Sequence, residues 1–181
     1  MNPRIRPPQT FETPRLRLRP PQKDDAAVIF SEYARDPEVT RFLLWRPHKS
    51  VRETKLFLTR CTTAWQRCSA FPWAITEKAS GRLVGMVEVR IDGHKADIGY
   101  VLSKAYWGRG YMPEAAAAII EWALQQPALY RIWAVCDTEN RASARVLEKV
   151  GMKKEGVLQR WIIHPNLSEE PRDCYCYAIA K

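Results

Sequence analysis

Residues 106–115, which read Tyr-Trp-Gly-Arg-Gly-Tyr-Met-Pro-Glu-Ala, carry the strongest signal in the sequence. Two glycines one residue apart, Gly108 and Gly110, let the backbone turn sharply and approach a ligand closely. An alanine-rich helix follows to about Leu124, with Pro113 in its first turn, where a missing N–H costs nothing. The unpaired N–H groups and the positive dipole end of such a helix attract phosphate. The stretch therefore predicts a pyrophosphate cradle.

A plain tight turn before an ordinary helix would explain the two glycines equally well. A dinucleotide-binding fingerprint is excluded, because Pro113 stands where a third glycine is needed. The expected acidic residue for the ribose is also missing.

The segments on both sides of this stretch alternate between strand and helix patterns. Arg15-Leu16-Arg17-Leu18-Arg19 has the period of two that predicts a half-buried strand. Ser50 and Glu53 form a capping-box pattern that predicts a helix to about Arg67. Asn140 and Gly151 bracket a further helix as its cap and its terminator. The remaining elements are a helix from Asp24 or Asp25 to Tyr33, and strands at 71–77, 82–91, 96–103, 130–136, 152–163 and 172–180.

This order of elements predicts an α/β (α+β mixed) fold with a mostly antiparallel central sheet. Ser80-Gly81 and Asp92-Gly93 mark hairpin turns, which join antiparallel strands. The strand–helix–strand unit over 96–136 implies one parallel, right-handed crossover. We expect a flexible N-terminal arm over residues 1–10 and a single domain over residues 11–181.

Composition and charge set further bounds on the chain. It has 181 residues, enough for one domain with a sizeable core. The net charge of +9 favours polyanionic partners such as coenzyme A or nucleic acid, although a solubilising surface explains it equally well. The five cysteines show neither zinc spacing nor a disulfide framework. With no signal peptide and no apolar run of membrane length, we expect a reducing, cytoplasmic location and no membrane contact.

Three blocks in the right order resemble the GCN5-related N-acetyltransferase (GNAT) superfamily. The first runs from Thr13 to Arg19, the second over residues 96–115, and the third over residues 131–152. The resemblance covers about residues 10–180 and is closest to the branch of ribosomal-protein N-terminal (alanine/serine) acetyltransferases. It implies a sheet of about seven strands flanked by four helices, with two parallel strands splayed apart at the cofactor site.

The resemblance also implies where acetyl-CoA binds, without any metal. Backbone amides of Gly108 to Met112 match the groups that hold the pyrophosphate in that family. The pantetheine arm lies between the strands that match 99–103 and 131–137. The implied cofactor residues are Tyr100, Val101, Leu102, Trp107, Gly108, Arg109, Gly110, Tyr111, Met112, Asn140 and Ser143. For Asn140, a helix cap and nothing more is the plain alternative.

Catalytic candidates follow from the chemistry of acyl transfer to an amine by direct attack. A backbone N–H of the 99–103 strand can stabilise the oxyanion. Many family members use a tyrosine to protonate the leaving thiolate, but Leu147 occupies the matching position here. Ser143 matches the residue assigned this role in the ribosomal-protein branch, or it serves only its own helix cap. Glu88 and Asp97 are candidates for the base, or are solvated strand residues.

The sequence leaves three alternatives for the function. The first is the α-amine of a protein N-terminus, whose pKa near 8 demands less of a base than that of lysine. The second is a small amine such as an amino acid, a polyamine or an antibiotic. The third is a non-catalytic acyl-CoA-binding module. Residues 36–50 and the loop holding His164 could wall the acceptor site, although surface roles are the simpler expectation for His48, His94 and His164. We expect no specific nucleic acid and a monomer or homodimer.

Overall fold

The central feature of the computed structural model, which describes residues 5–181, is one eight-stranded sheet. Its strand order is β1-β2-β3-β4-β5-β6-β8-β7, and every neighbouring pair is antiparallel except β5 and β6. The strands are β1 (Phe11–Glu12), β2 (Leu16–Arg19), β3 (Phe71–Glu77), β4 (Leu83–Asp92), β5 (Lys95–Leu102), β6 (Arg131–Asp137), β7 (Lys153–Ile162) and β8 (Arg172–Ala180). This confirms the predicted mixed fold.

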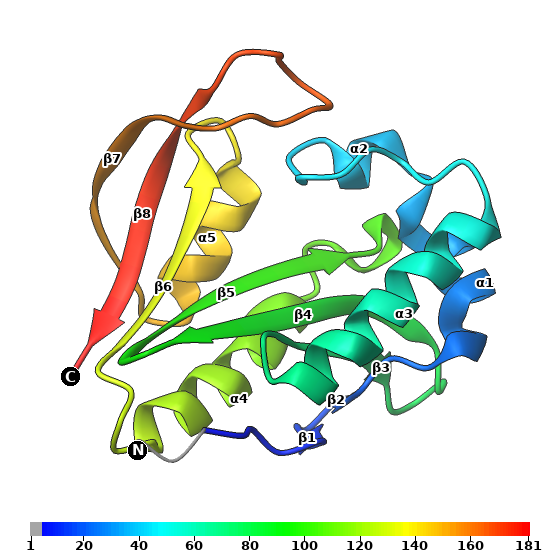
Figure 1. Cartoon of the computed structure of the whole chain (residues 1–181), viewed down its shortest axis with the longest axis horizontal. Coiled ribbons are helices and arrows are strands. Elements are labelled where there is room, and N and C mark those ends of the chain that lie inside the picture. Colours follow the sequence, from blue (N-terminus) through cyan, green and yellow to red (C-terminus); the bar gives the residue numbers. More distant parts are fainter. Residues whose placement is uncertain (1–4) are drawn as a thin grey trace.

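Helices cover both faces of the sheet (Figure 1). One face packs against α1 (Ala26–Ile29) and α3 (Val51–Arg67), and the other against α4 (Tyr111–Gln125) and α5 (Arg141–Lys149). A short helix, α2 (Pro37–Thr40), follows the helical stretch over 23–34 and is capped by the Asp36 carboxylate. Neither β1 nor α2 was expected, because two and four residues are too short to show a period.

The start of α3 differs in detail from the predicted capping box. Its first residue follows Ser50 as expected, but the Ser50 side chain caps no backbone amide. The Glu53 carboxylate instead accepts a hydrogen bond from the Lys49 N–H at 2.9 Å. An acidic side chain still satisfies a free donor at the helix start, one residue earlier than the pattern indicates.

Part of the N-terminal arm lies against the core. Residues 1–4 lie outside the described residues, whereas Pro7 is buried. The Trp73 indole is fully buried and donates its N–H to the carbonyls of Pro8 and Gln9, at 3.3 and 3.1 Å. Trp73 also meets the rings of Phe11 and Trp65 edge-on, at 5.4 and 5.3 Å. This aromatic cluster stabilises the half of the sheet that carries β2, β3 and β4.

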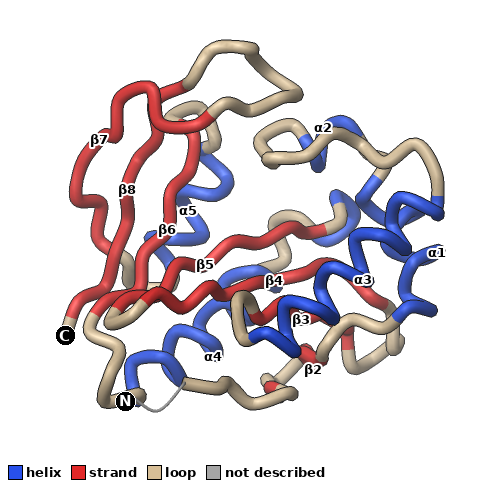
Figure 2. Tube along the Cα trace, viewed as in Figure 1, coloured by secondary structure: helices blue, strands red, loops and turns tan. Residues whose placement is uncertain are grey.

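Strands β5 and β6 separate along their length, which positions the candidate site. Their parallel pairing covers only Lys95–Asp97 and Arg131–Trp133. Beyond it, residues 98–102 pair with β4 alone and residues 134–137 with β8 alone. Figure 2 shows the two strands meeting at one end and diverging toward the other. The inner edges of both strands therefore present backbone groups that no other strand uses.

Candidate active site

The two-glycine loop lies between the end of β5 that diverges from β6 and the first residue of α4. Gly108 and Gly110 have φ values of 76° and 77°, a left-handed conformation that glycine adopts without strain. The helix begins directly afterwards at Tyr111, so its first backbone N–H groups are free of helical partners. The Arg109 guanidinium lies 5.2 Å from the centre of the Tyr106 ring, which adds a positive charge beside the helix start.

A brace from the N-terminal strands holds this loop. The Glu114 carboxylate accepts hydrogen bonds from the Thr13 hydroxyl at 2.6 Å and from the Arg15 backbone N–H at 2.9 Å. The Arg15 guanidinium binds the same carboxylate at 2.6 Å and donates to the Arg109 carbonyl at 2.9 Å. Partial burial favours the neutral acid, but these bonds keep the pKa of Glu114 below its usual value. The sequence analysis missed this contact.

A second contact joins the side chains of β5 and α5. The Tyr100 hydroxyl lies 2.9 Å from the Ser143 Oγ and donates to the Ser143 carbonyl at 3.2 Å. Burial raises the pKa of Tyr100, and the hydrogen bond to Ser143 offsets this only in part. The phenol therefore stays protonated at neutral pH. Ser143 was singled out from the sequence, but Tyr100 was expected to contribute only to cofactor binding.

Asn140 forms the helix cap that its position predicted. Its side-chain oxygen accepts from the Ser143 N–H at 3.1 Å. The Ser143 hydroxyl is thus not used by the cap and points to Tyr100 instead. Leu147, at the position where the family often has tyrosine, is buried in the core. Two residues of the predicted cofactor set, Leu102 and Trp107, bind each other through the indole N–H and the carbonyl, at 2.8 Å.

The two predicted base candidates lie together on the face of β4 and β5 that α3 covers. Arg90 donates to the Glu88 carboxylate at 2.9 Å and, through Nε, to the Asp97 carboxylate at 2.8 Å. In the β4–β5 register Glu88 lies directly opposite Gly99. Gly99 is just beyond the point at which β5 and β6 begin to separate. Burial raises the pKa of Glu88, with a further rise from the Asp97 charge, against the lowering effect of Arg90. Arg90, which the sequence analysis did not single out, joins the two acids.

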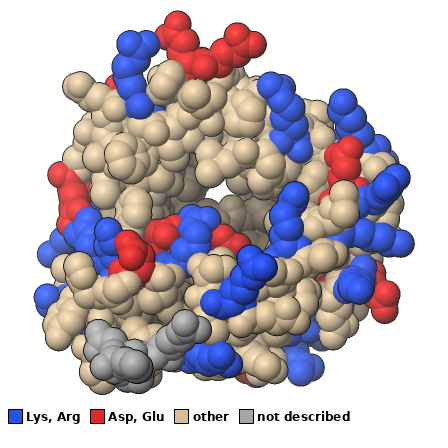
Figure 3. Space-filling view, in the orientation of Figure 1, with Lys and Arg blue, Asp and Glu red and all other residues tan. Residues whose placement is uncertain are grey.

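Two loops wall a hollow above this cluster. The Asn166 amide donates to the carbonyls of Thr40 and Trp45, at 2.7 and 2.8 Å, and so ties loop 163–171 to the end of α2 and the segment that follows it. The rings of Phe42 and His164 also meet edge-on at 6.2 Å. Figure 3 shows the hollow, with acidic and basic side chains below it over β4 and β5. Residues 36–50 and the His164 loop thus face each other across the hollow.

His164 is buried, not exposed as expected of a surface loop. Only 3% of the residue is accessible, and among residues 5–181 neither ring nitrogen has a hydrogen-bond partner. Its Nε2 lies 3.6 Å from the buried carboxylate of Asp137, which binds Arg172 at 2.6 Å. Burial lowers the pKa of His164, although Asp137 opposes the change. The neutral ring therefore helps to pack the loop.

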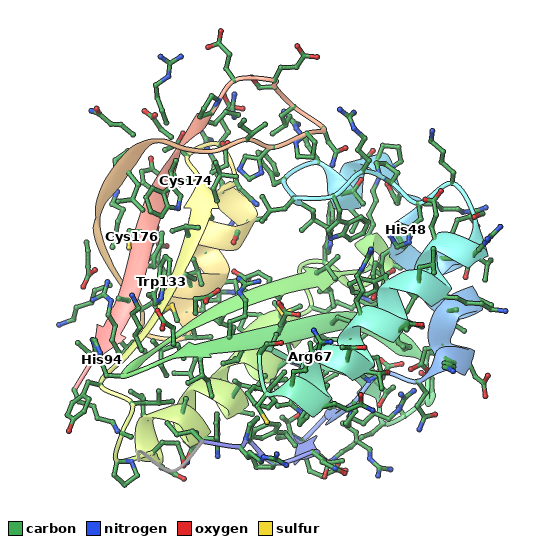
Figure 4. The ribbon with its side chains drawn as sticks, in the orientation of Figure 1. His48, Arg67, His94, Trp133, Cys174 and Cys176 are labelled. Atoms are coloured by element: carbon green, nitrogen blue, oxygen red, sulfur yellow. The ribbon has the colours of Figure 1, made fainter. Side chains whose placement is uncertain are left out.

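The other two histidines lie apart from this loop. His48 binds the Thr54 hydroxyl at 2.8 Å beside α3, and His94 precedes β5 near the C-terminus of the chain (Figure 4). Figure 4 also shows Trp133 on β6, which pairs with Asp97 where β5 and β6 still run together. Residues 5–181 contain no cluster of His, Cys, Asp and Glu placed to hold a metal ion. No helix in that part of the chain is long and apolar enough to span a membrane.

Most of the chain is similar to acetyltransferases of one family. The acetyltransferase (GNAT) domain family matches residues 15–153. An uncharacterized N-acetyltransferase of Bacillus subtilis, YoaA, is 30% identical over 174 residues, which cover 94% of this chain and 96% of YoaA. A GNAT-family acetyltransferase structure from Bacillus anthracis superposes with a TM-score of 0.82 at 29% identity, covering 94% of this chain and 98% of the other.

A more distant structure is similar in fold, and its name states what it acetylates. It is RimL, a ribosomal L7/L12 alpha-N-protein acetyltransferase in complex with coenzyme A. Its TM-score is 0.82 at 21% identity, with 93% of this chain and 95% of RimL covered.

Proposed function

Because this chain belongs to the GNAT acetyltransferase family and is therefore an acyltransferase, we propose that it acetylates the N-terminal α-amine of a protein or peptide, with acetyl-CoA as the acetyl donor. The observation that carries the proposal is the hollow between two tied loops, which opens directly onto the gap between β5 and β6. A chain end can enter such a hollow while the rest of the protein stays outside. The similarity in fold to RimL is consistent with this acceptor.

The groups around the gap fit acetyl-CoA. The two left-handed glycines expose the first amides of α4, and Arg109 adds a positive charge, which together suit a pyrophosphate. The unpaired edges of residues 98–102 and 134–137 offer donors and acceptors to the amide groups of a pantetheine arm. When bound, acetyl-CoA supplies the activated acyl thioester. Tyr100, Val101, Leu102, Trp107, Met112, Asn140 and Ser143 remain proposed contacts.

The protonation state of the cysteine thiols favours direct attack by the amine over an acetyl-cysteine intermediate. An acetyl-cysteine route would need a thiolate near the gap, since the thiolate is the nucleophilic form. Burial raises the pKa of Cys136 on β6 to about 12 and that of Cys174 on β8 to about 11. Both thiols are therefore protonated at neutral pH, which disfavours a covalent intermediate on them.

Proton transfers can be assigned to two groups of residues. We assign the base role to Glu88, because its raised pKa suits proton uptake near neutral pH better than that of an ordinary carboxylate. Asp97, bound to Arg90, positions that guanidinium. On the face of β5 toward α5, the Tyr100 and Ser143 hydroxyls can donate to a departing thiolate. Backbone N–H groups of β5 can stabilise the negative charge that develops on the carbonyl oxygen.

The chemistry of the base favours an α-amine over lysine. The α-amine has a pKa of about 8, whereas the pKa of the lysine amine is about 10.4. Deprotonation of the α-amine at neutral pH is therefore easier by roughly two pKa units. A single carboxylate that is already paired with Arg90 provides only modest assistance. The α-amine of a chain end is therefore the better match.

The test is release of free CoA thiol from acetyl-CoA by the purified protein. Acceptors would be N-terminal peptides, amino acids, polyamines and aminoglycosides, each at the same concentration. Turnover confined to peptides is the expected result. Turnover confined to small amines would reject the peptide acceptor but keep the enzyme. Binding of acetyl-CoA without turnover on any acceptor would favour a non-catalytic role.

A further inference from the structure

The rim of the acceptor hollow is basic on the side formed by α2 and α3. Arg41, Arg46 and Lys49 are exposed on the segment that forms one wall. Four further cations, Arg52, Lys55, Arg60 and Arg67, are exposed along α3. At 100° per residue these four positions fall on one side of the helix. Figure 3 shows Lys and Arg side chains on this side of the hollow, and Figure 4 places Arg67 at the C-terminal end of α3.

These seven cations differ from the other charges around the hollow in having no carboxylate partner. Within residues 5–181, none of them forms an ion pair at 4.0 Å or less. Several nearby carboxylates are paired with other bases: Glu38 with Lys104, Asp137 with Arg172, and Glu88 and Asp97 with the one cation Arg90. Glu53, at the start of α3, accepts the Lys49 backbone N–H and forms no ion pair within residues 5–181. The positive charge of the rim is thus available to a partner.

The floor of the hollow has the opposite sign. Glu88 and Asp97 share the single cation Arg90, which leaves one net negative charge where β5 begins to separate from β6. The facing loop, 163–171, carries Glu169 and Glu170. A ligand bound in the hollow would therefore have the negative floor at its inner end and the positive rim on the α3 side further out.

We infer that the preferred acceptor is an acidic N-terminal segment, in which carboxylate side chains follow directly after the reactive α-amine. This inference rests on the proposed peptide acceptor and names its chemical class. The α-ammonium group matches the negative floor, and the following carboxylates match the rim. A polyamine or an aminoglycoside is positive along its whole length, so the rim repels it. A basic tail is repelled in the same way.

The experiment compares three peptides that share the first residue and the length. Their second and third residues are Glu-Glu, Gln-Gln or Arg-Arg; arginine avoids the extra amine of lysine. At low ionic strength we expect kcat/KM to rank acidic over neutral over basic, with at least about a tenfold span. The span should shrink as salt is added, because exposed charges are screened within about 8 Å at physiological ionic strength.

A matched pair of double variants locates the effect. Arg41→Glu/Arg46→Glu reverses two rim charges, whereas Lys23→Glu/Lys153→Glu makes the same change in net charge at two exposed positions elsewhere. We expect the rim variant to lose the preference for the acidic peptide and the control to keep it. Equal losses in both variants would overturn the inference, because the overall charge would then explain the effect.

Other outcomes separate this inference from the proposed function. Peptide turnover without a charge preference would reject the acidic acceptor and leave the proposed function intact. No turnover on any peptide, with turnover on a small amine, would overturn both. Binding of an RNA oligomer that the rim variant loses, together with equal kcat/KM for the three peptides, would assign the basic rim to nucleic acid instead.

Discussion

Arg15 and Glu114 lie 99 residues apart in the sequence and meet at 2.6 Å beside the two-glycine loop. The same guanidinium donates to the Arg109 carbonyl inside that loop, and it lies 4.6 Å from the centre of the Tyr111 ring. A side chain of the N-terminal strands thus holds both the loop and the first turn of α4. This contact joins two sequence blocks, Thr13–Arg19 and 106–115, into one structural unit.

Removing this brace should weaken acetyl-CoA binding more than the chemical step. We expect Arg15→Ala to raise the KM for acetyl-CoA by about tenfold with little change in kcat, because a charge-assisted hydrogen bond contributes about 1.5–3 kcal/mol and Arg15 is partly exposed. Arg17→Ala, on the same strand, is the control, since its ion pair with Glu12 is largely exposed. A lower kcat with unchanged KM would contradict a positioning role.

The hydroxyl pair of Tyr100 and Ser143 should affect the chemical step. We expect Tyr100→Phe and Ser143→Ala each to lower kcat by about 10- to 100-fold, with a smaller rise in the KM for acetyl-CoA. The exposed Tyr130 provides a control through Tyr130→Phe. Steady-state kinetics with a leaving group of lower pKa adds a second readout. If the pair protonates the thiolate, the defect should shrink with the better leaving group.

Glu88 should show opposite effects on activity and stability. Its pKa in the folded protein lies above the unfolded value, chiefly because of burial. The stability linked to this group is therefore fully present below about pH 4.3 and is lost as pH rises through the folded pKa. At pH 7 we expect Glu88→Gln to raise the melting temperature while lowering kcat by about 10- to 100-fold. A variant that is both less stable and fully active would reject the assignment.

Arg90 should set the pH at which Glu88 works. Because Arg90 lowers the pKa of Glu88, Arg90→Met should move the acidic limb of the kcat–pH profile to higher pH. The measurement is kcat at saturating substrates across pH 4.5 to 9, with Glu88→Gln as the reference that lacks this limb. An unshifted limb would mean that Glu88 does not control the rate.

Loss of the Asn166 contact should weaken binding of the acceptor but not of acetyl-CoA. Asn166→Ala removes two hydrogen bonds between the walls, each worth about 1 kcal/mol. We expect the KM for peptide to rise about fivefold to tenfold with no change in the KM for acetyl-CoA. Asn166→Asp should be worse, because it places a carboxylate against two carbonyl oxygens. Equal shifts in both KM values would indicate a general loss of structure instead.

Local sequence patterns were sufficient for the longer helices and strands, but not for the short elements β1 and α2 or for the contacts between elements. The glycine loop, α3 and the cap at Asn140 follow from short-range rules, and the structure agrees with each position. The Arg15–Glu114 and Tyr100–Ser143 contacts depend on which strands and helices become neighbours, and no local pattern encodes that. The burial of His164 has the same origin, because its environment comes from Phe42 and Asp137 on distant segments.

Acetylation of a peptide α-amine by this chain can be tested directly. The most direct measurement is site-resolved mass spectrometry of an acidic peptide that contains one internal lysine, after incubation with acetyl-CoA and the protein. The same peptide with a blocked N-terminus is the control. We expect one acetyl group on the α-amine of the free peptide and none on the blocked peptide. Acetylation of lysine in both peptides, or no acetylation where a small amine is modified, would contradict it.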